Sequence, residues 1–189
     1  MPRDATIALA LLAALTVARA APSEDEVERL PGWRGPLPSR QWSGYINISE
    51  AMGADMRVHY WYIESEGSPE ADPLLVWTNG GPGASSMFGL LVELGPLLLN
   101  DESVQTAEYG RTGVPTMFYN PHSWSRLGGL LMFDWPPPVG FSYCNDPTAG
   151  GFSCGEWDDE RMAKASYAAL AGWCEPVSQS VFTNPYHGA

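Results

Sequence analysis

Basic side chains are scarce in this chain. Its 189 residues include 10 Lys and Arg against 22 Asp and Glu, which gives a formal net charge of −12 at pH 7. This charge repels phosphate-rich partners and disfavours nucleic acid or anionic membranes as ligands. It is compatible with an acidic compartment, where partly protonated carboxylates repel one another less. The length, with 44% hydrophobic and 17% charged residues, otherwise fits one globular domain.

Cysteine and histidine are also few, and their spacing does not suit a metal ion. The chain has three cysteines, Cys144, Cys154 and Cys174, and neither a Cys-x-x-Cys nor a His-x-x-x-His pair. We therefore predict no metal site and no cofactor. Cys144 and Cys154 flank a glycine-rich loop and are expected to close it as a local disulfide, which leaves Cys174 over.

Long apolar runs are missing except at the start of the chain. Residues 1–20 carry Arg3, an apolar run from Ile7 to Val17 and a small-x-small site ending at Ala20. This pattern predicts a secretory signal peptide, with the mature protein beginning near Ala21. The alternative is a retained anchor, but the run is short for a membrane span. We expect a soluble protein of the secretory pathway, secreted or vacuolar/lysosomal, without membrane contact after cleavage.

The most informative stretch runs from Leu74 to Pro96. The apolar run Leu74–Trp77 predicts a strand buried on both faces. Glycines and Pro82 then turn the backbone, and Ser85 or Ser86 is suited to cap a following helix. Such a strand, turn and helix start aims backbone N–H groups at one point, where they stabilise an anion. A phosphate loop is excluded by the spacing and by the lack of a nearby lysine, whereas a plain tight turn between core elements stays open.

Three ordered blocks make the sequence more specific than its glycines. They are Trp77-x-Asn79-Gly80-Gly81-Pro82-Gly83-x-Ser85-Ser86 with Gly89-Leu-x-x-Glu93-Leu-Gly-Pro96, Asn120-Pro-His-Ser-Trp124, and Asp134-Trp-Pro-Pro-Pro-Val-Gly-Phe-Ser-Tyr143. Together they resemble the serine carboxypeptidase family of the α/β-hydrolase fold, from about Leu30 to about Trp173. The family's complete domain is more than twice as long as this chain.

This resemblance implies a partial α/β-hydrolase fold, a mixed and mostly parallel sheet with flanking helices. It divides the chain into a signal peptide (1–20), an extended lead-in (21–42), the N-terminal part of the hydrolase domain (43–173) and a divergent tail (174–189). The family's nucleophile elbow would follow the helix that ends near Trp173, so we expect the fold to be truncated before it.

The residue pattern itself predicts the main elements. Ser43–Ile48 and Met56–Ile63 are expected to form antiparallel edge strands, and Gly129–Asp134 a buried strand parallel to Leu74–Trp77. The acidic segment Pro22–Glu28 is expected to be mobile. A helix beginning at Asp158 should turn one stripe to the core, formed by Ala163, Tyr167, Leu170 and Trp173.

By resemblance, the glycine loop carries half of a catalytic site. Gly81 would supply one oxyanion-hole N–H, and Gly80 would support the turn. Asn79 would donate its side-chain amide to the C-terminal carboxylate of a peptide or protein substrate, supported by Trp77 and Glu93. In the family Glu93 pairs with a glutamate beside the nucleophile, a carboxyl pair that favours acidic pH. The alternative for Glu93 is a solvated carboxylate at a helix end.

The chemistry of a complete hydrolase is missing from the sequence. The family's elbow string, Gly-Glu-Ser-Tyr-Ala-Gly, is absent after the helix that ends near Trp173. One Gly-x-Ser-x-Gly string, Gly151-Phe-Ser-Cys-Gly155, is present, but it lies before that helix, at the end of the glycine-rich loop. His59 and His122 are interpreted as structural.

The first hypothesis is the N-terminal portion of a serine-type carboxypeptidase that works through an acyl-enzyme, inactive as this chain alone. The alternatives are a non-catalytic secreted peptide-binding protein and a fragment of a related acyltransferase. Asn47 begins an N-glycosylation sequon, and the sequence leaves the oligomeric state open.

Overall fold

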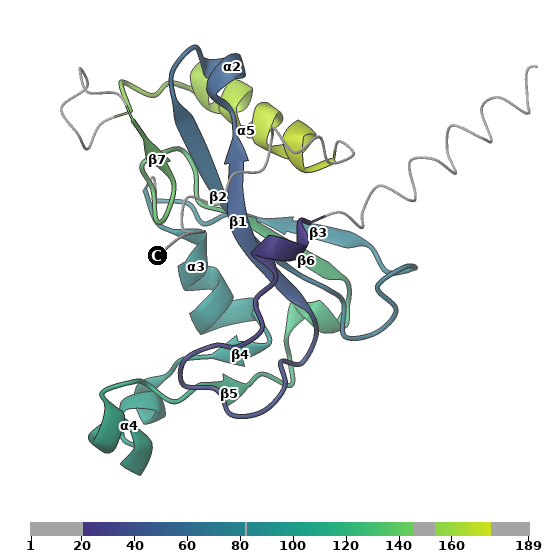
Figure 1. Cartoon of the computed structure of the whole chain (residues 1–189), viewed down its shortest axis with the longest axis vertical. Helices are drawn as coiled ribbons and strands as arrows, with labels where there is room; N and C mark the ends of the chain where they lie inside the picture. Colours follow the sequence, from purple (N-terminus) through teal and green to yellow (C-terminus); the bar gives the residue numbers. More distant parts are fainter. Residues whose placement is uncertain (1–20, 82, 146–153, 175–189) are drawn as a thin grey trace, which may run out of the picture.

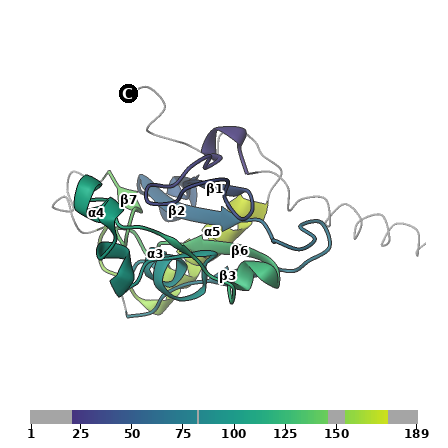
Figure 2. The same cartoon turned by 90° about the horizontal axis from the view of Figure 1, so that it is seen from below.

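The computed structural model describes residues 21–81, 83–145 and 154–174 (Figure 1), so the predicted signal peptide and most of the predicted tail lie outside the described residues. Four strands form the central sheet in the order β1 (Gln41–Asn47), β2 (Met56–Ile63), β6 (Gly129–Phe133) and β3 (Leu74–Trp77). A short fifth strand, β7 (Tyr143–Cys144), pairs with the start of β2. Figure 2 shows the same order from below, with β1 and β2 above β6 and β3.

The sheet is mixed, as predicted. β3 and β6 pair in parallel, with Leu74 opposite Gly129 and Trp77 opposite Met132, which confirms that these two strands are neighbours. The other pairs of the described sheet, β1–β2, β2–β6 and β2–β7, are antiparallel. The expected mostly parallel sheet is therefore not what the described strands form. β2 has the predicted bounds, and β1 begins two residues before the predicted Ser43.

Strand β6 is the centre of the core, and all five of its residues are buried. Alternate side chains point to opposite faces of the sheet. Leu131 and Phe133 face the helix α5 (Asp159–Cys174), whereas Leu130 and Met132 face α3 (Ser86–Phe88) and the π-helix η3 (Gly89–Leu94). α5 and α3 therefore pack against opposite faces of the sheet.

The predicted core stripe of α5 is correct in its second half, where Trp173 is buried and Leu170 packs against the core, and wrong in its first half. Tyr167 is 75% exposed and Ala163 is also exposed, whereas Ala165, Ala169 and Trp173 are buried. The two alanines let the helix lie close to the sheet, and the Trp173 ring packs on Tyr60 with centroids 4.7 Å apart. Small residues thus decided which face turned inward.

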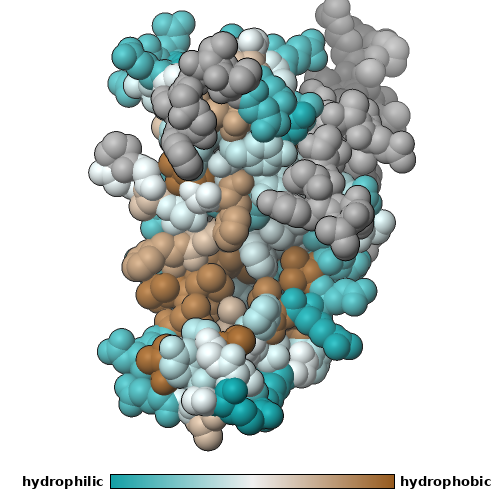
Figure 3. Space-filling model, turned by 60° about the vertical axis from the view of Figure 1, so that its left-hand side comes forward, coloured by the Kyte–Doolittle hydropathy of each residue, from teal (hydrophilic) through white to brown (hydrophobic). Residues whose placement is uncertain are grey.

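Strand β3 was predicted to be buried on both faces, and this prediction is wrong. Leu74 is 38% exposed and Val76 is 46% exposed, because β3 is the edge strand of the described sheet. Large apolar side chains of α3 and η3, Phe88 and Val92, are exposed as well. Figure 3 shows a broad apolar area across the middle of one face of the molecule.

The segment before β1 is structured where we expected a mobile lead-in. Ser23–Asp25 forms the 3-10 helix η2, and Glu26 forms a bridge with Trp42 of β1. Asp25 is only 4% exposed, and the Tyr60 hydroxyl donates a 2.8 Å hydrogen bond to its Oδ2. This buried polar contact, which the charge of the segment did not reveal, anchors the chain at Asp25. Leu30–Pro38 lacks helix and strand, as predicted.

The remaining elements are short and lie around this sheet. They are α2 (Ser49–Met52), β4 (Leu97–Leu98), η4 (Asp101–Val104), α4 (Ala107–Thr112), β5 (Phe118–Tyr119) and η5 (Trp124–Arg126). β4 and β5 form a separate antiparallel pair. Helices of bilayer-spanning length and apolarity are not found among the described residues.

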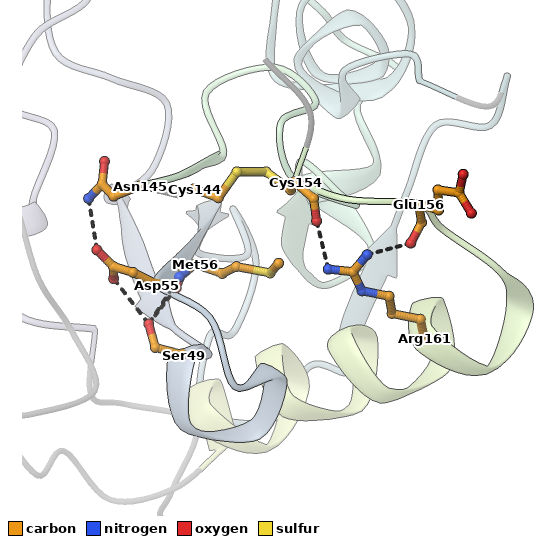
Figure 4. Close-up of a disulfide and its surroundings, with 8 residues drawn as sticks. All are labelled: Ser49, Asp55, Met56, Cys144, Asn145, Cys154, Glu156 and Arg161. Atoms are coloured by element: carbon orange, nitrogen blue, oxygen red, sulfur yellow. Dashed lines mark hydrogen bonds between the residues drawn. A yellow bond between two sulfur atoms is a disulfide. The ribbon is translucent and has the colours of Figure 1, made fainter. Parts of the chain in front are cut away.

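A disulfide joins Cys144 and Cys154, with their sulfur atoms 2.12 Å apart (Figure 4). Hydrogen bonds hold the chain at both ends of this link. Asn145 donates to Asp55 beside α2, and Arg161 of α5 donates to the Cys154 carbonyl. The glycine-rich loop between the cysteines, residues 146–153, lies outside the described residues, and Cys174 is a free, exposed thiol.

Candidate functional site

The loop after β3 turns on glycines, as its sequence predicts. Gly81 and Gly83 have φ of 138° and 97°, a region that side chains disfavour. The Ala84 N–H donates to the Gly80 carbonyl at 3.2 Å and closes the turn. Gly80 and Gly81 are exposed, so the backbone of this turn faces solvent. Pro82 lies outside the described residues.

The helix after the loop begins where the sequence predicts. Ser85 is the N-cap of α3, and its Oγ accepts from the Met87 N–H. The Ser86 Oγ donates to the Phe133 carbonyl of β6 at 2.5 Å and accepts from the Asn79 N–H at 3.1 Å. These contacts anchor both ends of the loop on the central strand.

Trp77 orients the side chain of Asn79. The indole Nε1–H lies 2.9 Å from Asn79 Oδ1, and an indole N–H can only donate. Oδ1 is therefore the acceptor, and the Nδ2 amide points away from the indole. Within the described part of the chain, no hydrogen bond occupies Nδ2. The amide thus keeps two donors for a ligand next to the exposed glycine turn.

Gly89 makes room for this pair. A Cβ at Gly89 would lie 2.6 Å from Asn79 Oδ1 and 2.7 Å from Trp77 Nε1. The backbone at Gly89 has ordinary right-handed helical angles, so space alone explains the glycine. The sequence predicts no role for Gly89. Its neighbours along the chain do not show whether a helical glycine is required by close packing.

We expect Gly89→Ala to separate Trp77 from Asn79 without unfolding the protein. The helix backbone tolerates alanine, which is more favourable than glycine in a helix by about 1 kcal/mol. This gain offsets part of the cost of the steric clash. Trp77 should therefore show an altered indole N–H resonance by NMR. Gly110→Ala, at a helical glycine with nothing within 4 Å of the added Cβ, is the matched control. An unchanged indole resonance in Gly89→Ala would contradict the close packing.

Glu93 lies one turn after Gly89, in η3, and is exposed. Among the described residues, it makes no hydrogen bond with Trp77 or Asn79. The solvated helix-end carboxylate that we kept as the alternative describes its present surroundings.

The second predicted block lies beside the end of η3. Asn120 is buried and donates to the Gly95 carbonyl at 2.9 Å, and Ser123 donates to the Leu94 carbonyl at 3.0 Å. Trp124 is 41% exposed and packs edge-on against Trp77 with ring centroids 5.5 Å apart. His122 is exposed.

A cavity of about 490 Å³ lies beside the glycine turn. Gly83 forms one wall, Pro136–Val139 another, and Trp157, Asp158, Asp159 and Met162 complete the lining. The glycine turn and the loop after β6 are therefore at the same end of the sheet, where the carboxyl ends of the parallel strands β3 and β6 lie. The lining is mainly apolar, with two carboxylates.

Asp134 connects several parts of this region, and the sequence reading gave it no site role. It is fully buried and accepts hydrogen bonds from His59, Ser85, Ser86 and the Phe141 N–H. Burial raises the pKa of Asp134, but the hydrogen bonds from His59, Ser85 and Phe141 outweigh it and hold the pKa below its usual range.

His59 also approaches Ser43, so that Ser43, His59 and Asp134 are linked as in a catalytic triad. Ser43 Oγ lies 2.9 Å from Nε2, and Nδ1 lies 3.1 Å from Asp134 Oδ2. The imidazole is buried, however, and the rings of Tyr45, Trp61 and Phe141 pack around it. A nucleophile needs access to a substrate carbonyl, so this arrangement supports the structural role predicted for His59.

The predicted glycosylation residue, Asn47, lies at the end of β1 and is partly exposed. Its Oδ1 accepts from the Ser49 N–H and from Arg57, each at 3.0 Å. Groups of three or more potential metal ligands are not found among the described residues.

Comparisons with known proteins place this geometry in a family. The serine carboxypeptidase family model matches residues 31–186, which extends past the Trp173 limit of the resemblance. The chain is 39% identical to the lysosomal protective protein of Mus musculus over 173 residues, which cover 90% of this chain and 32% of that protein. It is 36% identical to serine carboxypeptidase-like 13 of Arabidopsis thaliana over 179 residues, covering 95% and 38%.

A solved structure gives the same assignment. Kex1(delta)p, a prohormone-processing carboxypeptidase from Saccharomyces cerevisiae, matches with a TM-score of 0.60 and 30% identity, over 80% of this chain and 32% of that one. The chain thus spans about a third of the length of these relatives, with 32% and 38% coverage of the first two. The chain belongs to the serine carboxypeptidase family and has part of its α/β-hydrolase fold.

Proposed function

We propose that this chain carries the carboxylate-recognition and oxyanion half of a serine-type carboxypeptidase site. The observation that supports it is the pair formed by Trp77 and Asn79, in which the indole holds Oδ1 and leaves the Nδ2 amide open next to Gly80 and Gly81. An amide donor beside an exposed glycine turn suits an anionic group of the ligand. The ligand is the C-terminal carboxylate of a peptide.

The roles of the other residues follow from this ligand. Gly81 supplies a backbone N–H to the developing oxyanion of the scissile carbonyl, and Gly80 supports the turn. The mainly apolar cavity beside Gly83 takes a substrate side chain. Glu93 supports recognition of the substrate carboxylate only when a partner carboxyl faces it. Release of C-terminal residues would also need a serine nucleophile and a histidine base, which this sequence does not provide in the family's motif. We place this function in the secretory pathway.

We expect the chain to bind a peptide with a free C-terminus better than the same peptide with a C-terminal amide. The preference should be about tenfold or more, because hydrogen bonds to a charged group contribute about 1.5–3 kcal/mol. Asn79→Ala should remove most of it, and Asn79→Asp should reverse it through charge repulsion. Calorimetric titration of blocked dipeptides at about pH 5 measures both affinities.

Asn145→Ala is the matched control. It removes an exposed asparagine whose amide donates to Asp55, outside the glycine loop, and should keep the carboxylate preference. Equal affinity for the carboxylate and the amide in the unmodified chain would refute the proposed recognition.

A further inference from the structure

The four donors that reach Asp134 come from two different loops and from the sheet. Its Oδ1 accepts from the Ser85 Oγ at 2.7 Å and from the Ser86 N–H at 2.8 Å, at the end of the glycine loop. Its Oδ2 accepts from the Phe141 N–H and from His59 Nδ1, both at 3.1 Å. One carboxylate oxygen therefore accepts hydrogen bonds from the end of the glycine loop. The other accepts them from the loop after β6 and from strand β2.

The loop after β6 passes directly over this carboxylate. A Cβ at Gly140 would lie 2.3 Å from Asp134 Oδ2, and the φ of Gly140 is 57°. Ser142 ties the same loop to β2, since its Oγ accepts from the His59 N–H at 2.7 Å and also donates to the Asp134 carbonyl. The backbone of the loop lies so close to the Asp134 carboxylate that the position of the loop depends on the charge and the shape of this side chain.

We propose that Asp134 is the positioning residue of the candidate site, and that its carboxylate sets the placement of the glycine loop relative to the Pro136–Val139 loop across the cavity. A carboxylate can accept at both oxygens, which suits donors on both sides. An asparagine of the same shape has one oxygen and one NH₂ group, so its NH₂ must face the donors of one loop. The two loops cannot then both keep their bonds.

The placement of the loops is a property of the folded chain and does not depend on any ligand. Its consequence for peptide binding rests on the proposed function. The test therefore uses resonances of the unliganded full chain, and it remains decisive even if carboxylate recognition fails.

The experiment compares Asp134→Asn with the unmodified chain by NMR and hydrogen exchange. The Ser86 or Phe141 amide proton should move upfield in the variant, because it loses a charged acceptor. Exchange at Asn79 and Ala84, whose N–H groups are hydrogen-bonded in the glycine loop, should quicken by about tenfold or more relative to the amides of β6, as expected for losing one charge-assisted hydrogen bond. In the unmodified chain, the Ser86 amide shift should titrate at low pH, and in the variant this titration should vanish.

Among the described residues that hydrogen-bond to Asp134, His59 alone has an ionisable side chain. His59→Gln therefore tests whether the low-pH change of the Ser86 amide shift belongs to the carboxyl, in which case the variant should keep it. Loss of that change in His59→Gln would assign the titration to the histidine and overturn the proposal.

Two further variants guard against a purely structural effect. Asp25→Asn alters another buried carboxylate and should quicken exchange throughout the sheet, with an unchanged ratio of loop to β6 rates. Ser85→Ala removes one donor to Asp134 together with the oxygen that caps α3 at the Met87 N–H, and should disturb the glycine loop while the Phe141 amide stays in place. If Asp134→Asn does not fold, the Ser85→Ala variant tests the proposal in its place.

The proposal is overturned if Asp134→Asn leaves the loop-to-core exchange ratio unchanged, or if Asp25→Asn raises that ratio equally. It is also overturned if Ser85→Ala leaves the Ser86 resonance and the exchange of the glycine loop unchanged.

Discussion

The 189-residue chain is expected to show no measurable peptide hydrolysis under our proposal. Ser85 does not resemble an activated nucleophile, because its Oγ donates to Asp134 and caps α3. Ser43 has a histidine partner, but aromatic rings enclose that histidine. Loss of the triad in a serine protease lowers kcat by about 10⁶-fold, which places turnover below detection.

The measurement is an assay of the purified chain on blocked dipeptides at about pH 5, the acidic range expected for a carboxyl pair. A fluorophosphonate that labels activated serines should leave the chain unmodified, while a complete serine carboxypeptidase, as the positive control, is labelled and inhibited. Turnover that the reagent abolishes, with label on Ser85, Ser86 or Ser43, would mean that these residues hold a nucleophile after all.

A large loss of stability is expected from Gly44→Ala in β1. The added Cβ would lie 2.0 Å from Asp25 Oδ2, so it would force Asp25 away from the sheet. The buried Tyr60 hydroxyl would then lose its 2.8 Å hydrogen bond to Asp25. Overpacking together with this lost bond should cost about 3 kcal/mol. For a chain of this size, that lowers Tm by about 6–12 °C.

A double-mutant cycle tests the cause of this loss. In an Asp25→Ala background the obstacle is gone, so adding Gly44→Ala should cost little more. Gly110→Ala, in open surroundings, should leave thermal unfolding nearly unchanged. The same loss from Gly44→Ala in both backgrounds would show that the Asp25 contact is not responsible.

The difference between these two glycines illustrates how far local sequence can be interpreted. Both are single glycines within regular elements, and their neighbours along the chain predict no special role. Gly44 is restricted by Asp25, which lies 19 positions away in sequence (44 − 25) and is brought over β1 by the fold. Such contacts depend on the approach of distant segments, which no local pattern contains.

Local sequence accounts for the features that depend on neighbouring residues and on ordered motifs. The family, the bounds of β2, the parallel pairing of β3 with β6, the glycine turn and a cap at Ser85 or Ser86 were predicted, because alternation, turn residues and capping act over a few positions. The packing of distant segments, in contrast, sets which face of α5 is buried, places β3 at the edge of the described sheet and anchors the lead-in at Asp25. It also decided that Asp134 joins two loops, since one buried carboxylate can gather donors from segments that are distant in sequence.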